Sequence, residues 1–469
     1  MGDEMGPEPT GATVEALLAE GRRLIEARRP AEAAGVLECA ARASPGAPRV
    51  RIHLARALGL AGRAVEAEAQ ARAAVELDPD ATVGWTLLGT LLEQADRYPE
   101  ALAAFREALA REPMAPASFL RVALACARLG RGPEATAMLE AAGPLFPPGP
   151  WPTAWCALYS ATAKALLVAG EFDRGWGAMA SWVARAFPPP GDLRAWDGRE
   201  DLAGRAVVLT GVETGLGDWL QFARFARDLA ARGAAAIVGW PQKLLPLLPP
   251  DLAALALPPS RPTAPPVAVP MSLVPALLRL SPSQWRALDV PYLRAPDDRV
   301  DRWRARLSGV PGVKVGIAWW GSAGATDPYA WPARRGIPLA EFAPLATVPG
   351  VTLVSLQAGE GVEQMTTVGF PVLDLGPDRT LADDAAIVMS LDLVVGADSA
   401  PNHLAGALGR PTWAALPHKG DWRWLAGETT PWYPTLRLWR QRRPDDWPYV
   451  FGGMADALRE RIAACPRSR

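Results

Sequence analysis

Two short segments in the second half of the chain combine glycines, carboxylates and polar residues in an order that could support chemistry. In the first, Gly215 and Gly217 follow an apolar run, and Asp218 opens the next amphipathic stretch. Glycines permit a tight turn after a strand. A carboxylate placed there could act as a general base on an acceptor hydroxyl. Asp218 could instead cap its helix by accepting hydrogen bonds from the first free amides, and the residues alone leave both roles open.

The second segment runs from Asp398 to His403, directly after an apolar stretch. Pro401 suits the first turn of a helix, and the free amides and dipole of such a turn form a ready site for a diphosphate. Ser399 and Asn402 could donate hydrogen bonds to phosphate oxygens. His403 is one of 3 histidines and lies one turn into the expected helix. A lone histidine usually has a structural role, but its place beside an anion site predicts contact with a ligand.

Basic residues in two further loops could neutralise a departing diphosphate. Arg334 and Arg335 precede a predicted helix, and a guanidinium group can bind such a group bidentately. Lys419 and Asp421 lie with two tryptophans just after a predicted strand. The alternative for each arginine is an ordinary surface ion pair. The tryptophans either stack on a base or a sugar, or belong to the core.

These residues depend on elements that alternate between strand and helix. Apolar runs of strand length are typical of buried parallel strands, and they occur at 206–211, 234–240, 313–320, 351–357, 372–376, 391–398 and 411–417. Helices are predicted at 217–233, 339–347, 379–390 and 443–464. A proline-rich stretch up to about residue 270 is left unassigned. The alternation predicts two Rossmann-like lobes, whose ligands bind beyond the carboxyl ends of the strands.

The first part of the chain repeats every 34 residues. Alanine recurs at 33, 67, 101 and 135 and at 40, 74, 108 and 142, and proline recurs at 45, 79, 113 and 147. The unit at 82–115 has the tetratricopeptide pattern, with Trp85, Leu88, Gly89, Ala101, Phe105, Ala108 and Pro113. A fifth, degenerate helix pair is expected to end near 170–187. The pattern predicts an α-solenoid with a concave groove. This groove could bind a protein or peptide partner, or the solenoid could be a spacer or a dimerisation element.

Composition excludes several classes of protein. The 469 residues are 49% hydrophobic and carry a formal net charge of -1, so the basic excess of a nucleic-acid-binding protein is missing. The 4 cysteines are scattered and predict reduced thiols rather than disulfides or a zinc site. Neither a signal sequence nor an apolar run long enough to span a membrane is present. We therefore expect a cytoplasmic protein.

The motifs together resemble a known family. They read GRAVVLTGVETGLGDWLQFARF (204–225), VKVGIAWWGS (313–322), RRGIPLAEFAPL (334–345), VTLVSLQAGEG (351–361) and DLVVGADSAPNHLAGALGRPTWAALPHKGDWRWL (392–425), followed by TPWYP (430–434). In order and spacing they resemble the bacterial tetratricopeptide-repeat glycosyltransferases, which are similar to lipopolysaccharide heptosyltransferases in their catalytic fold. They also resemble O-linked N-acetylglucosamine transferases in pairing repeats with a transferase.

The resemblance implies a GT-B fold of two Rossmann-like lobes. It also implies an inverting, metal-independent transfer of a sugar from a nucleotide-diphosphate donor to a protein or glycan acceptor, without a cofactor. By resemblance, Asp218 is the catalytic base, Ser399 and His403 belong to the donor-diphosphate loop, and Arg335 is the basic residue before the I-P-L helix start. The predicted donor-binding residues are Gly217, Arg335, Gln357, Asp398, Ser399, Asn402, His403 and Lys419.

The motifs also depart from the family at four places. Two of them are Ser399, where relatives have threonine, and the loop before Arg335, which lacks the histidine and asparagine often found there. Relatives read E-Q-G-L-G-D where this chain has Thr214, and they carry a basic residue where it has Ala358. A scaffold protein with a degenerate, inactive transferase lobe is therefore an alternative, and a nucleotide-sugar epimerase of the same fold is a weaker one.

Five regions are expected. They are a disordered N-terminus (1–12), tetratricopeptide repeats (13–149), a degenerate helical repeat with a linker (150–200), an acceptor-side lobe (201–309) and a donor-binding lobe (310–469).

Overall fold

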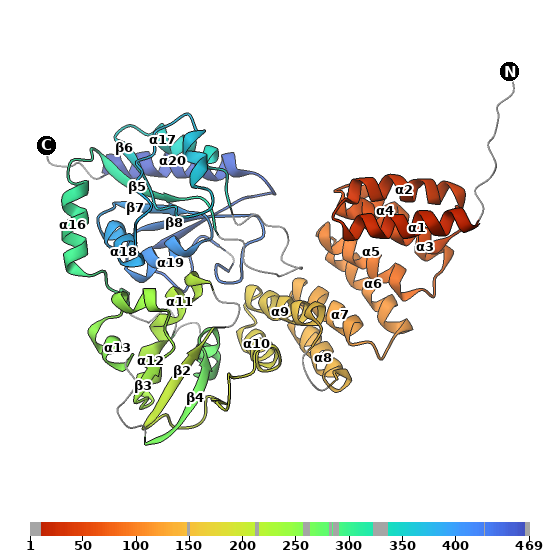
Figure 1. Ribbon diagram of the computed structural model, residues 1–469, viewed down its shortest axis with the longest axis horizontal. Helices are drawn as coiled ribbons and strands as arrows, with labels where there is room; N and C mark the ends of the chain where they lie inside the picture. The colour runs from red at the N-terminus through yellow and green to blue at the C-terminus, as the bar shows by residue number, and fades with distance from the viewer. Residues whose placement is uncertain are drawn as a thin grey trace. The chain divides into compact units, whose positions relative to one another are not determined.

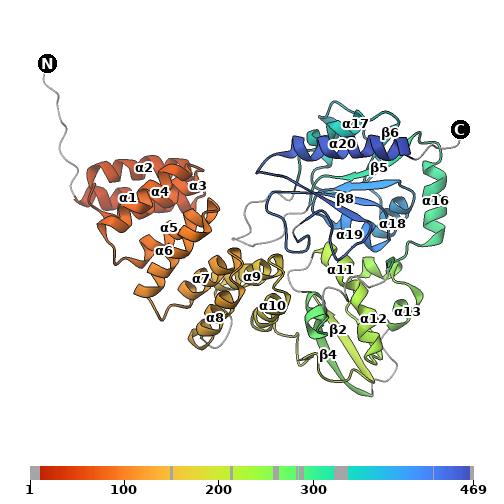
Figure 2. The same cartoon turned by 180° about the vertical axis from the view of Figure 1, so that it is seen from behind.

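The computed structural model describes residues 11–147, 151–211, 215–256, 263–280, 284, 290–321, 336–425 and 427–464. The chain divides into two compact units, Met1–Ala178 and Met179–Arg469. Within the described residues the first unit is helical, and the second contains two parallel sheets with helices around them (Figures 1 and 2). The chain therefore has the predicted order of a helical solenoid followed by α/β lobes.

The helices of the first unit pack in sequence as antiparallel pairs. They are α1 (Gly11–Glu26), α2 (Pro30–Ala43), α3 (Pro48–Leu60), α4 (Ala64–Leu77), α5 (Thr82–Gln94), α6 (Tyr98–Arg111), α7 (Pro116–Arg128), α8 (Gly132–Ala142), α9 (Thr153–Val168) and α10 (Phe172–Ala186). A short 3₁₀ turn, η1 (Gly143–Leu145), follows α8. Helix α10 crosses the division between the units, which falls inside the segment expected to be a degenerate repeat and linker.

The repeated small residues lie where neighbouring helices come closest. The alanines of both columns are at most 1% exposed. A Cβ atom built at Gly89 would lie 2.5 Å from Cε1 of Phe105, so α5 approaches α6 too closely for any side chain there. Helices α2, α4 and α6 each end just before a proline of the third column, since proline cannot continue a helix.

Replacing Gly89 by alanine should destabilise the repeat unit, because the new methyl group overlaps the ring of Phe105. Overpacking of this kind costs about 1–3 kcal/mol. The matched control is Gly35→Ala on α2, where a Cβ meets nothing within 4 Å; it should stabilise its helix by about 0.5–1 kcal/mol. Hydrogen exchange of peptides from α2, α5 and α6 measures both effects. Equal stabilisation by the two substitutions would contradict the packing explanation.

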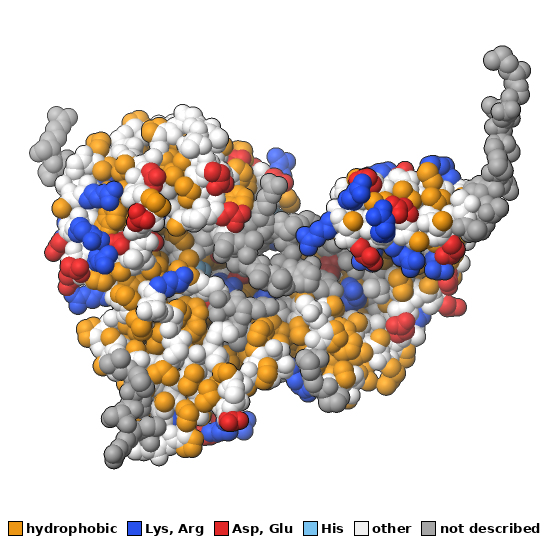
Figure 3. Space-filling model, viewed as in Figure 1, with side chains coloured by type: hydrophobic (Ala, Val, Ile, Leu, Met, Phe, Trp, Pro, Cys, Tyr) orange, Lys and Arg blue, Asp and Glu red, His pale blue; other side chains and the backbone are white. Residues whose placement is uncertain are grey.

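Charged side chains repeat with the same period as the alanines. An arginine at the start of each second helix pairs with a glutamate three residues later, as in Arg29–Glu32, Arg63–Glu66, Arg97–Glu100 and Arg131–Glu134. Figure 3 shows basic and acidic side chains intermingled over this part of the chain. Exposed pairs of this kind contribute little to stability, so most of these charges keep the solenoid solvated.

The first sheet of the second unit has four parallel strands in the order β1-β4-β2-β3. The strands are β1 (Arg194–Ala195), β2 (Arg205–Thr210), β3 (Ala236–Val238) and β4 (Ala264–Pro270). The predicted helix 217–233 is interrupted and forms α11 (Leu216–Phe222), η2 (Ala223–Phe225) and α12 (Ala226–Ala231). The remaining elements of this lobe are η3 (Gln242–Leu247), α13 (Pro250–Leu255), η4 (Met271–Leu273) and α14 (Val274–Leu277).

Strand β4 lies in the stretch that was too rich in proline to assign. Its pairing with β2 shifts register between Arg205 and Val207, opposite the two prolines 265 and 266. A bulge accommodates proline because the residue has no amide hydrogen to offer the ladder. The strand then pairs regularly over its buried half, 267–269, so local proline content conceals a central strand.

The second sheet has five parallel strands in the order β6-β5-β7-β8-β9. They are β5 (Val313–Ala318), β6 (Val351–Ser355), β7 (Leu393–Gly396), β8 (Thr412–Leu416) and β9 (Leu436–Arg440). Strand β9 is not among the strands that the sequence predicts. The predicted strand 372–376 is wrong, because it makes only one isolated bridge between Val354 and Leu373.

Helices cover both faces of the second sheet (Figures 1 and 2). They are α16 (Asp297–Leu307), η5 (Leu339–Phe342), α17 (Ala343–Ala346), η6 (Val362–Thr366), α18 (Leu381–Met389), α19 (Ala400–Ala407) and α20 (Trp447–Ala464). On one face, Phe342 and Phe451 meet with ring centroids 4.4 Å apart and pack on Val315 and Ile317 of β5. Helices α18 and α19 lie on the opposite face.

Helix α16 packs with the second lobe. The expected lobe boundary at 309/310 assigned it to the first lobe, but it contacts α18. Its buried residues Val300, Trp303 and Leu307 recur at helical spacing and form one apolar face. This face lies against α18, a helix of the second sheet's lobe.

Candidate functional site

Asp218 lies in the first turn of α11, where Gly215 is the N-cap residue. Its Oδ2 atom accepts a hydrogen bond from the amide of Gly215 at 3.1 Å, which satisfies one of the free amides that begin a helix. Its Oδ1 atom accepts from the guanidinium group of Arg423. The Asp218 side chain is 13% exposed and that of Arg423 is 17% exposed. The carboxylate therefore caps its helix and forms an ion pair between the two lobes.

Arg423 is the centre of a charged cluster that the sequence analysis missed. Its Nη1 atom donates to Asp421 at 2.7 Å, and its guanidinium group lies 4.6 Å from the ring centroid of Trp422. Burial alone lowers the pKa of Arg423, but three neighbouring carboxylates raise it above its usual range. These belong to Asp218, Asp421 and Asp398. A signal was present in the sequence, because Arg423 stands between two tryptophans in a loop after a strand.

The second predicted segment lies against the first. Helix α19 starts after Ser399, with Pro401 in its first turn as predicted, and it packs against α11. A Cβ atom built at Gly217 would lie 2.9 Å from Cδ2 of His403. The glycine therefore lets the two helices touch, and the structure brings Gly217, Asp218 and His403 together across the lobes.

His403 is 4% exposed and is held by aromatic residues. Its Nδ1 atom is 2.9 Å from the hydroxyl of Tyr433, and its ring stacks on Trp424 with centroids 5.0 Å apart. Burial raises the pKa of Tyr433 well above its usual value, so the phenol stays neutral. Trp424 is fully buried and belongs to the core. A place in the core was one of the two roles expected for the tryptophans of this loop.

Tyr433 also belongs to a buried set that joins the lobes. The guanidinium group of Arg224 lies 4.9 Å from its ring and 4.4 Å from the ring of Tyr292. The Nη2 atom of Arg224 donates to the Tyr292 hydroxyl at 3.1 Å, and this hydroxyl donates to the carbonyl of Leu220 in α11. Nothing in the sequence pattern singles out Arg224 or Tyr292, because their roles depend on contacts between distant segments.

The side-chain amides of two predicted donor-binding residues form hydrogen bonds with the main chain. Nδ2 of Asn402 donates to the carbonyls of Gly396 and Ala397 at 3.2 and 2.7 Å, and the side chain is fully buried. Oε1 of Gln357 accepts from the amides of Trp319 and Trp320 at 3.1 and 2.9 Å. Both residues therefore fix the loops at the carboxyl ends of the strands.

The remaining predicted residues lie around this cluster. Ser399 is half-buried, and its hydroxyl donates to the carbonyl of Ala397 at 3.1 Å. Asp398 is half-buried beside Arg440. Burial lowers the pKa of Arg440, and the charge of Asp398 opposes that effect. Lys419 is exposed in the loop after β8.

Arg334 and Arg335 lie outside the described residues. Among the residues that are described, no three His, Cys, Asp or Glu side chains group as metal ligands do. None of the described helices has both the length and the apolar composition needed to cross a membrane.

Comparison with known proteins identifies the repeats and the relatives of the whole chain. Two models of the tetratricopeptide repeat match residues 24–91 and 86–150. The chain is 30% identical over 459 residues to protein FlbA of Caulobacter vibrioides, and the match covers 88% of this chain and 73% of FlbA. The chain belongs to the FlbA family. Because the match covers so much of the chain, membership of the FlbA family rests on the α/β unit as well as the repeats.

Two solved structures are similar to part of the chain. MamA of Desulfovibrio magneticus RS-1 is 16% identical, with 37% of this chain and 94% of that chain covered at a TM-score of 0.32. A thermophilic repeat protein of Thermus thermophilus is 23% identical, with 38% and 93% covered at a TM-score of 0.30. The two matching repeat models and the paired helices of the first unit show that this member of the FlbA family carries a tetratricopeptide-repeat solenoid. Units of this type bind other proteins along their surface.

Proposed function

We propose that the α/β unit is an inverting glycosyltransferase that moves a sugar from a nucleotide-diphosphate donor to a protein or glycan acceptor. The repeats would recruit the acceptor or a partner. The observation that carries the proposal is the contact between Gly217–Asp218 of α11 and the Asp398–His403 segment that opens α19. A predicted base and a predicted diphosphate loop come from sheets far apart in the sequence, yet they meet at one place.

In the proposed reaction, the oxygen of the acceptor attacks the anomeric carbon while the bond to the diphosphate breaks. Asp218 accepts the acceptor proton as a general base. The free amides at the start of α19 stabilise the charge that grows on the departing diphosphate. Asn402 and Gln357 would contribute by holding these loops in place rather than by touching the donor.

Arg423 would have to change partners during this reaction. Both oxygens of Asp218 are engaged, one by the Gly215 amide and one by Arg423. The guanidinium group is the partner that can leave, since it is at the end of a flexible side chain. A donor diphosphate offers it a stronger set of acceptors, so donor binding would free Asp218 and place a cation on the leaving group at the same time.

A second candidate function is a scaffold without catalysis. It is favoured by the burial of His403 and by the Asp218–Arg423 pair, which together close the contact between α11 and α19. On this alternative the repeats bind a partner and the α/β unit binds no nucleotide sugar.

A thermal-shift screen with UDP, GDP, ADP, TDP and CMP and their sugars distinguishes the two functions. A ligand at 100 times its Kd stabilises the native state by about 2.7 kcal/mol. His403→Ala should abolish the shift, because it removes the side chain against which Gly217 of α11 packs at the proposed donor site. With the donor known, Asp218→Asn should keep donor binding and lose about 10²–10⁴ in transfer rate. Asp301→Asn, at an exposed pair with Arg304, is the control. Full transfer by Asp218→Asn would disprove its role as base, and a screen without any shift would favour the scaffold.

A further inference from the structure

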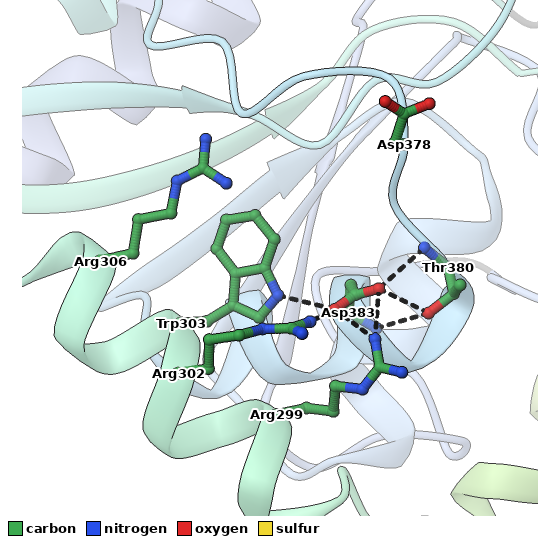
Figure 4. Close-up of a pocket in the computed structure, with 7 residues that line it drawn as sticks. All are labelled: Arg299, Arg302, Trp303, Arg306, Asp378, Thr380 and Asp383. Carbon is green, nitrogen blue, oxygen red and sulfur yellow. Dashed lines mark hydrogen bonds and ion pairs between the residues drawn. The ribbon is translucent and has the colours of Figure 1, made fainter.

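A cavity of about 430 Å³ lies between α16 and the start of α18, and it shares no residue with the site described above. Three arginines project from one face of α16 on one side of it, and Asp378, Thr380 and Asp383 lie on the other (Figure 4). The arginines are Arg299, Arg302 and Arg306. They occupy positions three and four residues apart and therefore share one face of the helix.

Asp383 holds side chains on both sides of this cavity. Its two carboxylate oxygens already accept hydrogen bonds from protein groups and are not available to a ligand. Both its oxygens accept from Arg299 at 2.9 Å, and it also accepts from Arg302 and from the indole of Trp303. Its other donors are the amide and hydroxyl of Thr380. The negative charge of Asp383 therefore holds Arg299, Arg302 and the first turn of α18 in place.

Two charged groups of the cavity are left uncommitted among the described residues. Arg306 lies 4.7 Å from the ring centroid of Trp303 and makes one long hydrogen bond of 3.4 Å to the carbonyl of Leu375. No carboxylate of the described chain pairs with it. Asp378 makes no hydrogen bond or ion pair with the described residues, and it lies across the cavity from Arg306 in Figure 4.

This arrangement fits a ligand that has an anionic group at one end and hydroxyl groups at the other. Three guanidinium groups face two carboxylates, so the cavity carries excess positive charge and favours a net anion. Guanidinium groups match the oxygens of a phosphate, and a free carboxylate accepts hydrogen bonds from hydroxyls. We infer that the cavity binds an organic phosphate carrying hydroxyl groups. Its phosphate is held by Arg306, and a hydroxyl is held by Asp378.

The backbone before α18 keeps this cavity separate from the proposed transferase site. Asp378 and Thr380 line the cavity, whereas Arg379 between them is 5% exposed and turns the other way. Arg379 donates to the carbonyl of Gln357 and to Asp384, both at 3.1 Å. The phosphate site therefore does not depend on the transferase proposal, although a ligand in it would contact the segment that also supports Gln357.

Isothermal titration of the full chain with ribose 5-phosphate, inorganic phosphate and ribose, at constant ionic strength, tests the inference. Ribose 5-phosphate should bind more tightly than inorganic phosphate, and ribose should not bind measurably. Arg306→Ala should weaken both phosphates at least about ten-fold, the loss expected from removing a charge-assisted hydrogen bond. The matched control is Arg304→Ala on the same helix, which pairs with Asp301 and should bind like the wild type.

Asp378→Asn separates the two ends of the ligand. Removing this negative charge should tighten the binding of inorganic phosphate. It should also reduce or abolish the difference in affinity between ribose 5-phosphate and inorganic phosphate. The inference fails if the wild type shows no saturable binding at millimolar phosphate, or if Arg306→Ala and Arg304→Ala behave alike. It also fails if binding is lost in His403→Ala but kept in Arg306→Ala, because the phosphate would then occupy the transferase site. Tighter binding of a zwitterionic amino acid than of either phosphate would likewise overturn it.

Discussion

Replacing Arg423 by alanine is expected to destabilise the α/β unit by about 3 kcal/mol, because it leaves carboxylates without a cation in a mostly buried site. Asp218 and Asp421 are 13% and 21% exposed, and each gives an oxygen to the guanidinium group. The same substitution removes a cation from the ring of Trp422. Hydrogen exchange of peptides from α11 and α19 measures this effect without a contribution from unfolding of the repeats.

Arg437→Ala is the matched control for this prediction. Arg437 also lies over a tryptophan, with its guanidinium carbon 4.1 Å from the centroid of Trp439. It also pairs with a carboxylate, Glu428, but at 3.4 Å and with both side chains well exposed. Its loss should cost at most about 1 kcal/mol. If Arg423→Ala and Arg437→Ala lost similar amounts of stability, burial of the Arg423 ion pairs between the lobes would not increase their contribution to stability.

A double-mutant cycle isolates the contact between the lobes. In the Arg423→Ala background, Asp218→Asn removes a charge that has lost its partner. The substitution should therefore reduce stability much less in that background than in the wild type. Residues in one ion-pair network usually show coupling energies of about 0.5–3 kcal/mol. A coupling near zero would mean that the pair does not hold the lobes together.

Replacing Asp383 by alanine should destabilise the second lobe by about 3–5 kcal/mol, because the variant leaves two arginines and an indole without their shared acceptor. Asp383 is 3% exposed and joins α16 to α18 through side chains of both helices. The control Asp301→Ala breaks an exposed pair on the outer side of α16 and should change the free energy of unfolding by less than about 1 kcal/mol.

The contribution of Asp383 should also depend on pH in a defined direction. Burial alone raises the pKa of Asp383, but hydrogen bonds from Thr380, Trp303 and Arg299 outweigh it and hold the pKa far below the ordinary range. A carboxyl group whose pKa is depressed by folding stabilises the native state above its unfolded pKa of about 3.9, and this contribution is lost as the pH falls below that value.

Urea unfolding of the wild type and of Asp383→Ala at pH 7, 5, 4 and 3 measures this dependence. The difference between their free energies of unfolding should be constant from pH 7 to 5 and shrink below about pH 4. A difference that grows on acidification would show that the carboxylate is destabilised in the folded protein and that the assigned hydrogen bonds are incorrect.

The repeats could be predicted from the sequence because their information is local. Ala33, Ala67 and their counterparts recur at one spacing, and each packs against its nearest neighbours along the chain. The strands β2, β5, β7 and β8 were found for a similar reason, since buried parallel strands are short continuous apolar runs. Strand β4 was concealed by Pro265 and Pro266, which only a bulge in the pairing accommodates. The contact of α16 with α18 could not be predicted, because the amphipathic pattern of α16 shows that it is buried but not against which partner.

The candidate site divides in the same way. Glycine and aspartate after one strand, and Asp398 to His403 after another, are readable in the sequence as the starts of two helices, α11 and α19. Their meeting is not, because Asp218 and Arg423 are 205 residues apart and touch only when the two lobes close on each other. Likewise, the sequence predicts that Asn402 and Gln357 lie at strand ends, but it does not predict the partners of their hydrogen bonds. Local periodicity determines the elements, whereas the partners of buried polar groups are decided by tertiary packing, since each such group must be satisfied by whichever segment reaches it.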